Sequence, residues 1–250
     1  MEEIVYSVVI PLKDEEETIA ALIDEVHQAM APLGKPWELI CIDDGSSDAT
    51  RSILRRLLPL RPYLRLLALD SNHGQSTAFD AGFRAARGCY VITLDGDGQN
   101  DPKEIPRLLE AAQASGEGGV DLVCGYRLQR RDSFFKRLLS RLANGVRSRV
   151  CGDGIRDTGC SLKVYRREAL AKIKLFDGMH RFLPALFLAE GFSVIELVVS
   201  HRERMGGRTK YTLWNRSFNT FFDMLAVRWM GRRALRYSVC EERADGRGAG

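Results

Sequence analysis

Short apolar runs alternate with longer segments of helical periodicity over the first half of the chain. The runs typical of buried strands are 6–11, 38–42, 64–69, 90–94 and 121–125. Apolar residues at helical spacing between these runs predict helices over 15–31, 50–58, 75–87 and 102–114. Strands that alternate with helices in this way predict an α/β fold, in which helices flank both faces of a mostly parallel sheet.

The pattern changes after about residue 127. Two longer helices are predicted, over 133–150 and 213–230, each with apolar residues on one face. In the second helix the apolar stripe comprises Trp214, Phe218, Phe221, Leu225 and Trp229. We predict three parts: an α/β domain over 1–210, an amphipathic region over 211–238 and a disordered, charged and Gly-rich tail over 239–250.

The charge of the chain is unevenly distributed. The net charge is +4, but residues 127–149 hold eight Lys or Arg against one acid, and residues 200–237 hold nine against two. Such asymmetry predicts a face that meets anions, such as phosphates or anionic lipid. The six cysteines form no C-x-x-C pair, and no leader peptide or membrane-spanning run is evident, so we expect a reducing, cytoplasmic location.

An acidic motif follows the strand predicted over 90–94. In the segment DGDGQ, the side chains of Asp95, Asp97 and Gln99 are spaced two residues apart, so an extended backbone brings them to one side. Two carboxylates and an amide oxygen are ligands that suit Mg²⁺ or Mn²⁺ with positions left open for a diphosphate. A bare D-x-D is also common in acidic turns, and its place after a buried strand favours the metal site.

A second acidic motif, Asp43-Asp44-Gly45-Ser46, follows the strand predicted over 38–42. In a parallel sheet, ligands bind beyond the carboxyl ends of the strands. We expect Pro11 and Glu15, at the end of the first strand, to join these residues at one rim of the sheet. A carboxylate at this rim suits hydrogen bonds from a base or a ribose, although DDGS alone is equally a turn and a helix cap.

Six motifs in order carry a family resemblance over residues 5–230. They are VVIP-x₃-E, ICIDDGSSD, N-x-GQSTAFDAGF, LDGDGQNDP, DTGCSLKVYRRE and R-x₂-G-x-TKY. This series resembles family 2 glycosyltransferases of the polyprenyl-phosphate branch, which includes dolichol-phosphate mannosyltransferases and undecaprenyl-phosphate glycosyltransferases. The resemblance implies a GT-A fold and an inverting transfer of a sugar from a nucleotide diphosphate sugar, UDP- or GDP-linked, to a polyprenyl phosphate.

The resemblance also implies roles for particular residues. Asp95, Asp97 and Gln99 match the metal triplet, and the nucleotide-contacting positions are Pro11, Glu15, Asp43, Asp44 and Asp95. The acceptor-phosphate positions are Arg127, Lys136, Arg137 and Ser140, and Arg204, Thr209 and Lys210 match the loop that closes over the phosphates. Of these, Asp97, Arg127, Arg204 and Lys210 are the expected catalytic residues. The first motif departs from the family, because Lys13 and Asp14 stand where an aromatic residue and an asparagine are usual.

The chemistry of the acceptor favours the same interpretation. A sugar hydroxyl needs a general base, whereas a lipid phosphate is already anionic and needs cations to hold it in line. We therefore expect the basic segments to serve the lipid phosphate and an anionic membrane surface, with the enzyme attached peripherally, alone or through a membrane-embedded partner. Two alternatives remain: a soluble or cell-envelope saccharide acceptor, with Asp153 or Asp157 as the base, and an anion-binding module. Nucleic acid is not an expected partner, because no RNP or KH signature is present.

Overall fold

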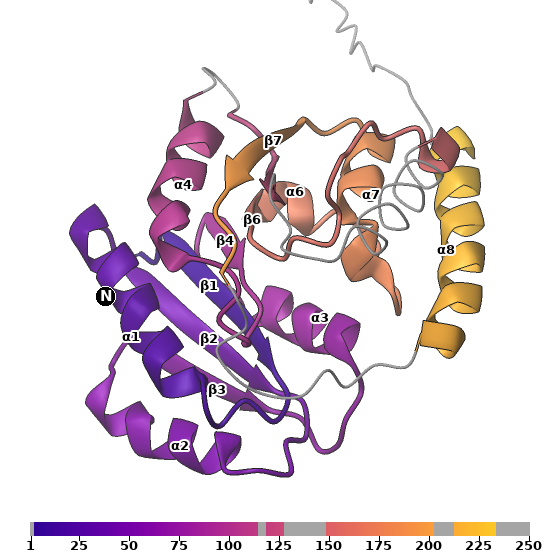
Figure 1. The fold of residues 1–250 in the computed structure, drawn as a ribbon. Coiled ribbons are helices and arrows are strands. Elements are labelled where there is room, and N and C mark those ends of the chain that lie inside the picture. The colour runs from indigo at the N-terminus through magenta and orange to yellow at the C-terminus, as the bar shows by residue number, and fades with distance from the viewer. Residues whose placement is uncertain (1–2, 115–118, 128–148, 203–212, 234–250) are drawn as a thin grey trace, which may run out of the picture.

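A computed structural model describes residues 3–114, 119–127, 149–202 and 213–233, without the side chains of residues 213–220. Seven strands form one sheet in the order β3-β2-β1-β4-β6-β5-β7. The strands are β1 (Tyr6–Leu12), β2 (Trp37–Asp43), β3 (Leu64–Ala68), β4 (Tyr90–Thr93), β5 (Leu122–Arg127), β6 (Lys163–Arg166) and β7 (Val194–Val199). All neighbouring pairs are parallel except those of β6, which runs antiparallel to β4 and to β5. The predicted α/β fold with a mostly parallel sheet is therefore confirmed (Figure 1).

Helices cover both faces of this sheet. They are α1 (Ile19–Met30), α2 (Thr50–Leu57), α3 (Gln75–Ala85), α4 (Ile105–Gln113), α6 (Arg167–Leu170), α7 (Leu183–Ala189) and α8 (Leu213–Arg233). Short 3₁₀ turns are η1 (Ala31–Leu33), η2 (Leu58–Leu60), η3 (Pro102–Glu104) and η4 (Met179–Arg181). One hydrophobic cluster unites the sheet with α1, α2 and α4, and the other unites it with α3, α6, α7 and α8.

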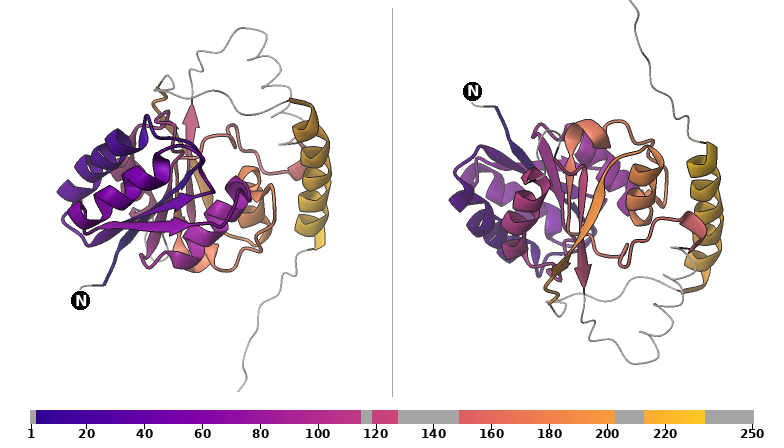
Figure 2. Two further views of the ribbon diagram at one scale, coloured as in Figure 1. Left: turned by 90° about the horizontal axis from the view of Figure 1, so that it is seen from below. Right: turned by 90° about the horizontal axis from the view of Figure 1, so that it is seen from above.

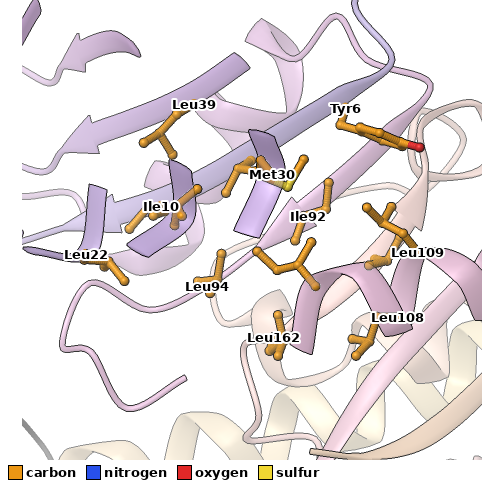
Figure 3. Close-up of a cluster of buried hydrophobic side chains, with 14 of the residues drawn as sticks. Tyr6, Ile10, Leu22, Met30, Leu39, Ile92, Leu94, Leu108, Leu109 and Leu162 are labelled. Carbon is orange, nitrogen blue, oxygen red and sulfur yellow. The ribbon is translucent and has the colours of Figure 1, made fainter. Parts of the chain in front are cut away.

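The alternation of side chains along the strands divides the core between these two clusters. In β1, Val8 and Ile10 belong to the cluster under α1 and α4, while Val9 between them belongs to the cluster under α3. This is the expected result of a strand whose successive side chains point to opposite faces of a sheet that is buried on both. Figure 3 shows the first cluster, in which Met30 of α1 and Leu108 and Leu109 of α4 gather over strand residues such as Ile92.

The first helix begins later than the sequence predicted. Its start was expected at residue 15, but α1 begins at Ile19. The intervening backbone is held by a neighbouring loop: the N–H groups of Asp14 and Glu15 donate to Ser46 Oγ and Thr50 Oγ1 at 2.9 and 2.8 Å. The N–H groups at the start of a helix have no acceptor within it, and at the predicted start the side chains of the neighbouring loop satisfy them. The other predicted strands and helices of the first half lie within a few residues of their expected bounds.

The last described helix stands at the outside of the molecule. In the three views, α8 lies beyond α7 as seen from the sheet (Figures 1 and 2). Its inner face includes buried Met224 and Val227. Its outer face exposes large apolar side chains instead: Phe221, Phe222, Leu225 and Trp229 are 51, 54, 41 and 62% exposed.

Most of the helix predicted over 133–150 lies outside the described residues, as does the tail over 239–250. None of the described helices is both long and apolar enough to cross a bilayer.

Candidate functional site

The carboxyl ends of β1, β2 and β4 surround a cavity of about 330 Å³, here called the first cavity. Its lining residues are Pro11, Leu12, Lys13, Glu15, Asp44, Asn72, Gly74, Gln75, Ala78, Asp95, Gly96, Asp97 and Gln99. The predicted rim residues Pro11, Glu15 and Asp44 are therefore brought together with the metal triplet. This is the place where a parallel sheet binds ligands, since the loops after successive strands meet there.

Hydrogen bonds from neighbouring segments fix the turn that carries the triplet. Asn100 is buried, and its Oδ1 accepts from the backbone N–H of Asp95 at 3.1 Å and from Ser161 Oγ at 2.7 Å. Thr18 Oγ1 donates to the carbonyl of Gly96 at 2.8 Å. A Cβ at Gly96 would lie 2.5 Å from a methyl carbon of buried Leu12 and 3.3 Å from the Pro11 carbonyl oxygen, so a larger residue here would have to displace Leu12. These contacts hold Asp95 and its neighbours in one conformation at the wall of the cavity.

The triplet fits a divalent cation bound through oxygen. Burial, and to a lesser extent the charge of Asp97, raises the pKa of the Asp95 carboxyl above its ordinary value. A cation would relieve this unfavourable pair of charges. Across residues 3–114, 119–127, 149–202 and 213–233, no three His, Cys, Asp or Glu side chains gather as a metal cluster. A third protein ligand would have to be an amide or hydroxyl oxygen, as the Gln99 amide is, and such oxygen donors suit Mg²⁺ or Mn²⁺.

The two acids of the DDGS motif differ in their surroundings. Asp44 lines the first cavity, and its two carboxylate oxygens accept from the backbone N–H groups of His73 and Gly74 at 2.7 and 2.9 Å. Asp43 is fully buried and does not line this cavity. Its carboxylate accepts from the Arg51 guanidinium and from the backbone N–H of Ser46. Asp43 therefore supports the loop, while Asp44 faces the space where a nucleotide would lie.

Gln75 links this loop to the metal triplet. The backbone just before it is held by Asp44, and its side chain donates from Nε2 to Asp95 Oδ1 at 2.8 Å. It lies at the first position of α3, where the chain leaves the cavity rim. Gln75 belongs to the motif N-x-GQSTAFDAGF, but the sequence alone assigns it no role. Only its position inside that motif could have marked Gln75 as a site residue. The spacing of residues does not show which side chain of α3 reaches the turn after β4.

A second cavity of about 300 Å³ adjoins the first, and both are lined by Gln75 and Asp95. The remaining lining residues are Phe79, Thr93, Thr158, Gly159, Cys160, Ser161, Lys163, Tyr165, His180, Arg181 and Leu183. Lys163 is the first residue of the antiparallel strand β6, and so lies beside the carboxyl end of β4. The second cavity thus contains cationic side chains from two distant parts of the chain, and sequence reasoning had assigned no role to Lys163.

Arg127, expected at the acceptor phosphate, ends β5 and is largely buried. Its Nε and one terminal nitrogen donate to the two carboxylate oxygens of Asp157 at 2.7 and 3.0 Å. The two side chains are 12 and 4% exposed. Neither residue lines the first or the second cavity. Lys136, Arg137 and Ser140, like Arg204, Thr209 and Lys210, lie outside the described residues, so their expected roles stay predictions.

Comparison with known proteins agrees with the arrangement of the site. The family model for glycosyl transferase family 2 matches residues 7–174, a segment that includes every residue placed at the two cavities except His180, Arg181 and Leu183. A dodecaprenyl-phosphate galacturonate synthase of Rhizobium johnstonii is 37% identical over 234 residues, covering 92% of this chain and 68% of that protein. An undecaprenyl-phosphate 4-deoxy-4-formamido-L-arabinose transferase of Edwardsiella ictaluri is 39% identical, covering 88% and 66%. The chain therefore spans about two thirds of the length of these relatives.

Solved structures share the fold. Glucosyl-3-phosphoglycerate synthase of Mycobacterium tuberculosis, in complex with Mn²⁺, UDP and phosphoglyceric acid, has a TM-score of 0.63 at 18% identity, covering 94% of this chain and 80% of its own. A mannosyltransferase of Pyrobaculum calidifontis, in complex with GDP-mannose and Mn²⁺, has a TM-score of 0.60 at 22% identity, covering 83% and 59%. The shared fold is of the GT-A type. On the extent of the family match and the identity to its relatives, the chain belongs to glycosyl transferase family 2.

Proposed function

We propose that this protein transfers a sugar, with inversion, from a nucleotide diphosphate sugar to a polyprenyl phosphate. The observation that carries the proposal is the first cavity, which Asp95, Asp97 and Gln99 line together with Pro11, Glu15 and Asp44. The R. johnstonii and E. ictaluri relatives, whose names specify dodecaprenyl and undecaprenyl phosphate, support a lipid phosphate as the acceptor.

Within this proposal, Asp95, Asp97 and Gln99 hold Mg²⁺ or Mn²⁺. Such a cation neutralises the charge that develops on the departing nucleoside diphosphate. Mn²⁺ in the solved structures of the mycobacterial and archaeal proteins supports this assignment. Asp44 and Glu15 line the same cavity, and their carboxylates can accept hydrogen bonds from the base or the ribose. Asp43 contributes by holding the loop in shape, through Arg51 and Ser46.

The surroundings of the candidate bases favour a phosphate acceptor over a saccharide. A saccharide hydroxyl would need a carboxylate base beside the sugar, and Asp153 and Asp157 were the candidates. Asp157 is held by Arg127 in a bidentate ion pair, and Asp153 is buried with its Oδ1 accepting from the backbone N–H of Ile155. Neither lines the two cavities. An ionised phosphate acceptor needs no base, so transfer to a phosphate does not depend on either of these two residues.

The outer face of α8 supports attachment to a membrane surface. At about 100° per residue, Phe221, Leu225, Trp229 and Phe222 lie within one arc of roughly 100°, opposite buried Met224 and Val227. Three arginines, Arg228, Arg232 and Arg233, occur in the last two turns of the same helix. Exposed aromatic residues beside arginines suit the headgroup boundary of an anionic membrane. We propose that residues 211–238 form this interface and that residues 1–210 form the catalytic domain.

A donor screen tests the proposed reaction. Purified protein is incubated with undecaprenyl phosphate, Mn²⁺ and each of a set of UDP- and GDP-linked sugars labelled in the sugar. Label that enters the lipid phase with one donor supports the proposal. Label that enters only a soluble or cell-envelope saccharide added in parallel identifies the saccharide reaction instead, and the proposed acceptor is then wrong.

A further inference from the structure

Lys163 is a buried cation that neither the metal site nor the proposed acceptor site uses. Only 3% of the residue is exposed, and its ammonium donates to the carbonyl of Cys160. Among the residues that the structure describes, no carboxylate forms a salt bridge with it. An ammonium group carries three donors, so two remain for whatever occupies the space beside it. A buried charge is costly unless it is paired, which points to an anionic or oxygen-rich ligand.

The space beside Lys163 is the second cavity, and its position identifies which part of a ligand reaches it. The two cavities share Asp95 and Gln75 as a common wall. If the triplet holds the diphosphate of the donor, the sugar attached to that diphosphate starts at this wall. A volume of about 300 Å³ is ample for one sugar ring. The second cavity is therefore placed to receive the sugar of the donor.

Cationic side chains outnumber carboxylates among the residues that line this cavity. Lys163 and Arg181 line it together with a single carboxylate, that of Asp95, and the hydroxyls of Thr158 and Ser161 add neutral hydrogen-bonding groups. Arg181 also interacts electrostatically with Asp223 of α8, so part of its charge is matched by that carboxylate. His180 is held by Ser76 Oγ, at 2.8 Å from its Nδ1. A cation bound at the triplet would offset the charge of Asp95 and leave the cavity positive.

We propose that the second cavity is the sugar subsite and that Lys163 makes it select donor sugars that carry a carboxylate, the uronic acid class. This inference rests on the proposed use of a nucleotide sugar. A carboxylate on the sugar ring pairs with the Lys163 ammonium, whereas a neutral hexose leaves Lys163 only the Asp95 carboxylate, which is proposed to bind the metal. The selection therefore comes mainly from the penalty that the neutral sugar incurs, as in other sites that reject a ligand lacking a required polar group.

The test compares donors that differ only at carbon 6 of the sugar. Calorimetric titration with Mn²⁺ present measures the affinity for UDP-glucuronate against UDP-glucose, and for UDP-galacturonate against UDP-galactose; GDP-mannuronate against GDP-mannose covers the other base. We expect at least one uronate to bind about ten-fold or more tightly than its neutral partner. Equal affinities in all three pairs would overturn the proposal without any variant.

Variants of Lys163 then test whether this residue causes the preference for uronates. Lys163→Gln and Lys163→Met are expected to remove the uronate preference while leaving the affinity for UDP or GDP within about two-fold. Lys172→Gln, at an exposed lysine outside both cavities, is the matched control and keeps the preference. A preference that survives in both folded Lys163 variants contradicts the assignment. A variant that instead weakens binding of inorganic or polyprenyl phosphate, with donor preference intact, shows that Lys163 serves the acceptor.

These titrations need no acceptor, so they separate this inference from the proposed reaction. Uronate selectivity without any lipid product would leave the sugar subsite in place and overturn the polyprenyl phosphate acceptor. A lipid product formed equally well from neutral and acidic sugars would support the polyprenyl phosphate acceptor and overturn the selection of uronates by Lys163.

Discussion

Gln75 Nε2 donates to Asp95 Oδ1 at 2.8 Å, joining the start of α3 to the turn after β4. The same stretch of backbone is tied to the loop after β2, because Asp44 accepts from the N–H groups of His73 and Gly74. Asp44 and Asp95, which lie 51 positions apart in the chain, are thus connected through three consecutive residues. A chain of hydrogen bonds therefore connects the DDGS loop to a proposed metal ligand.

The hydrogen bond from Gln75 is expected to contribute to metal affinity. Gln75→Leu removes a donor to a charged acceptor, an interaction worth about 1.5–3 kcal/mol, so Mn²⁺ should bind about ten-fold or more weakly. Titration of Mn²⁺ followed by electron paramagnetic resonance measures this directly. Arg84→Ala, at an exposed position of the same helix, is the control and should bind Mn²⁺ normally. Normal affinity in folded Gln75→Leu would show that Asp95 is oriented without it.

The raised pKa of Asp95 predicts a pH dependence in the metal-free protein. Because the folded state holds this proton more tightly than the unfolded state, Asp95 stabilises the fold below the ordinary carboxyl pKa. That contribution is lost as the pH rises through the raised value. Over the same window Mn²⁺ affinity should increase, since the cation displaces the proton. Thermal unfolding and Mn²⁺ titration across this range measure both effects, and Asp95→Asn should show neither.

The Arg127–Asp157 pair makes a stability prediction. Arg127→Ala leaves the Asp157 carboxylate, which is 4% exposed, without its guanidinium partner. Breaking such a pair costs about 3–5 kcal/mol, so Tm should fall by several degrees. Adding Asp157→Asn should recover much of the loss, and nucleotide affinity should stay near normal because Arg127 does not line the first cavity. If Arg127→Ala unfolds at the wild-type temperature, the pair is not a structural one, and the arginine is available to the acceptor phosphate.

Membrane attachment through α8 is tested by flotation with vesicles. The wild-type protein should bind vesicles that contain anionic lipid and be released by high salt, because screening weakens attraction between surface charges. Phe222→Ser with Trp229→Ser should reduce binding about ten-fold or more with little effect on Tm, since both side chains are exposed. Leu60→Ser, which changes an apolar side chain 64% exposed on η2, is the matched control. Wild-type protein that ignores these vesicles at low salt would instead point to a membrane-embedded partner.

The elements of the first half were predictable because each carries its own periodicity. Strands buried on both faces read as continuous apolar runs, and the acids that follow them had to meet at the rim of a parallel sheet. Strands β6 and β7 were not predicted. The four residues of β6 are too few to show a period, and their antiparallel course depends on β4 and β5. Lys163 was missed for the same reason, since only that course carries it to the cavity.

The distinction between Asp43 and Asp44 also required the structure. Adjacent residues of a strand point to opposite sides, but the sequence does not show which side Arg51 occupies. The sequence showed the apolar stripe of α8 but not whether this stripe packs on the domain or faces outward. Phe221, Leu225 and Trp229 face outward because Met224 and Val227, on the other side of the helix, are the residues that pack inward.

Transfer of a sugar onto a lipid phosphate at the metal triplet can be read from the mass of the lipid product. Protein, Mn²⁺ and the best donor are incubated with undecaprenyl phosphate or, in parallel, with undecaprenol, and the lipids are analysed by mass spectrometry. One added sugar is expected on the phosphate lipid alone, and EDTA should abolish this product reversibly. Asp97→Asn, which removes one metal-facing charge, should fold normally and lower turnover at least ~100-fold, about 2.7 kcal/mol. Equal transfer to undecaprenol, or near-normal turnover in folded Asp97→Asn at saturating Mn²⁺, would contradict transfer onto a lipid phosphate at this triplet.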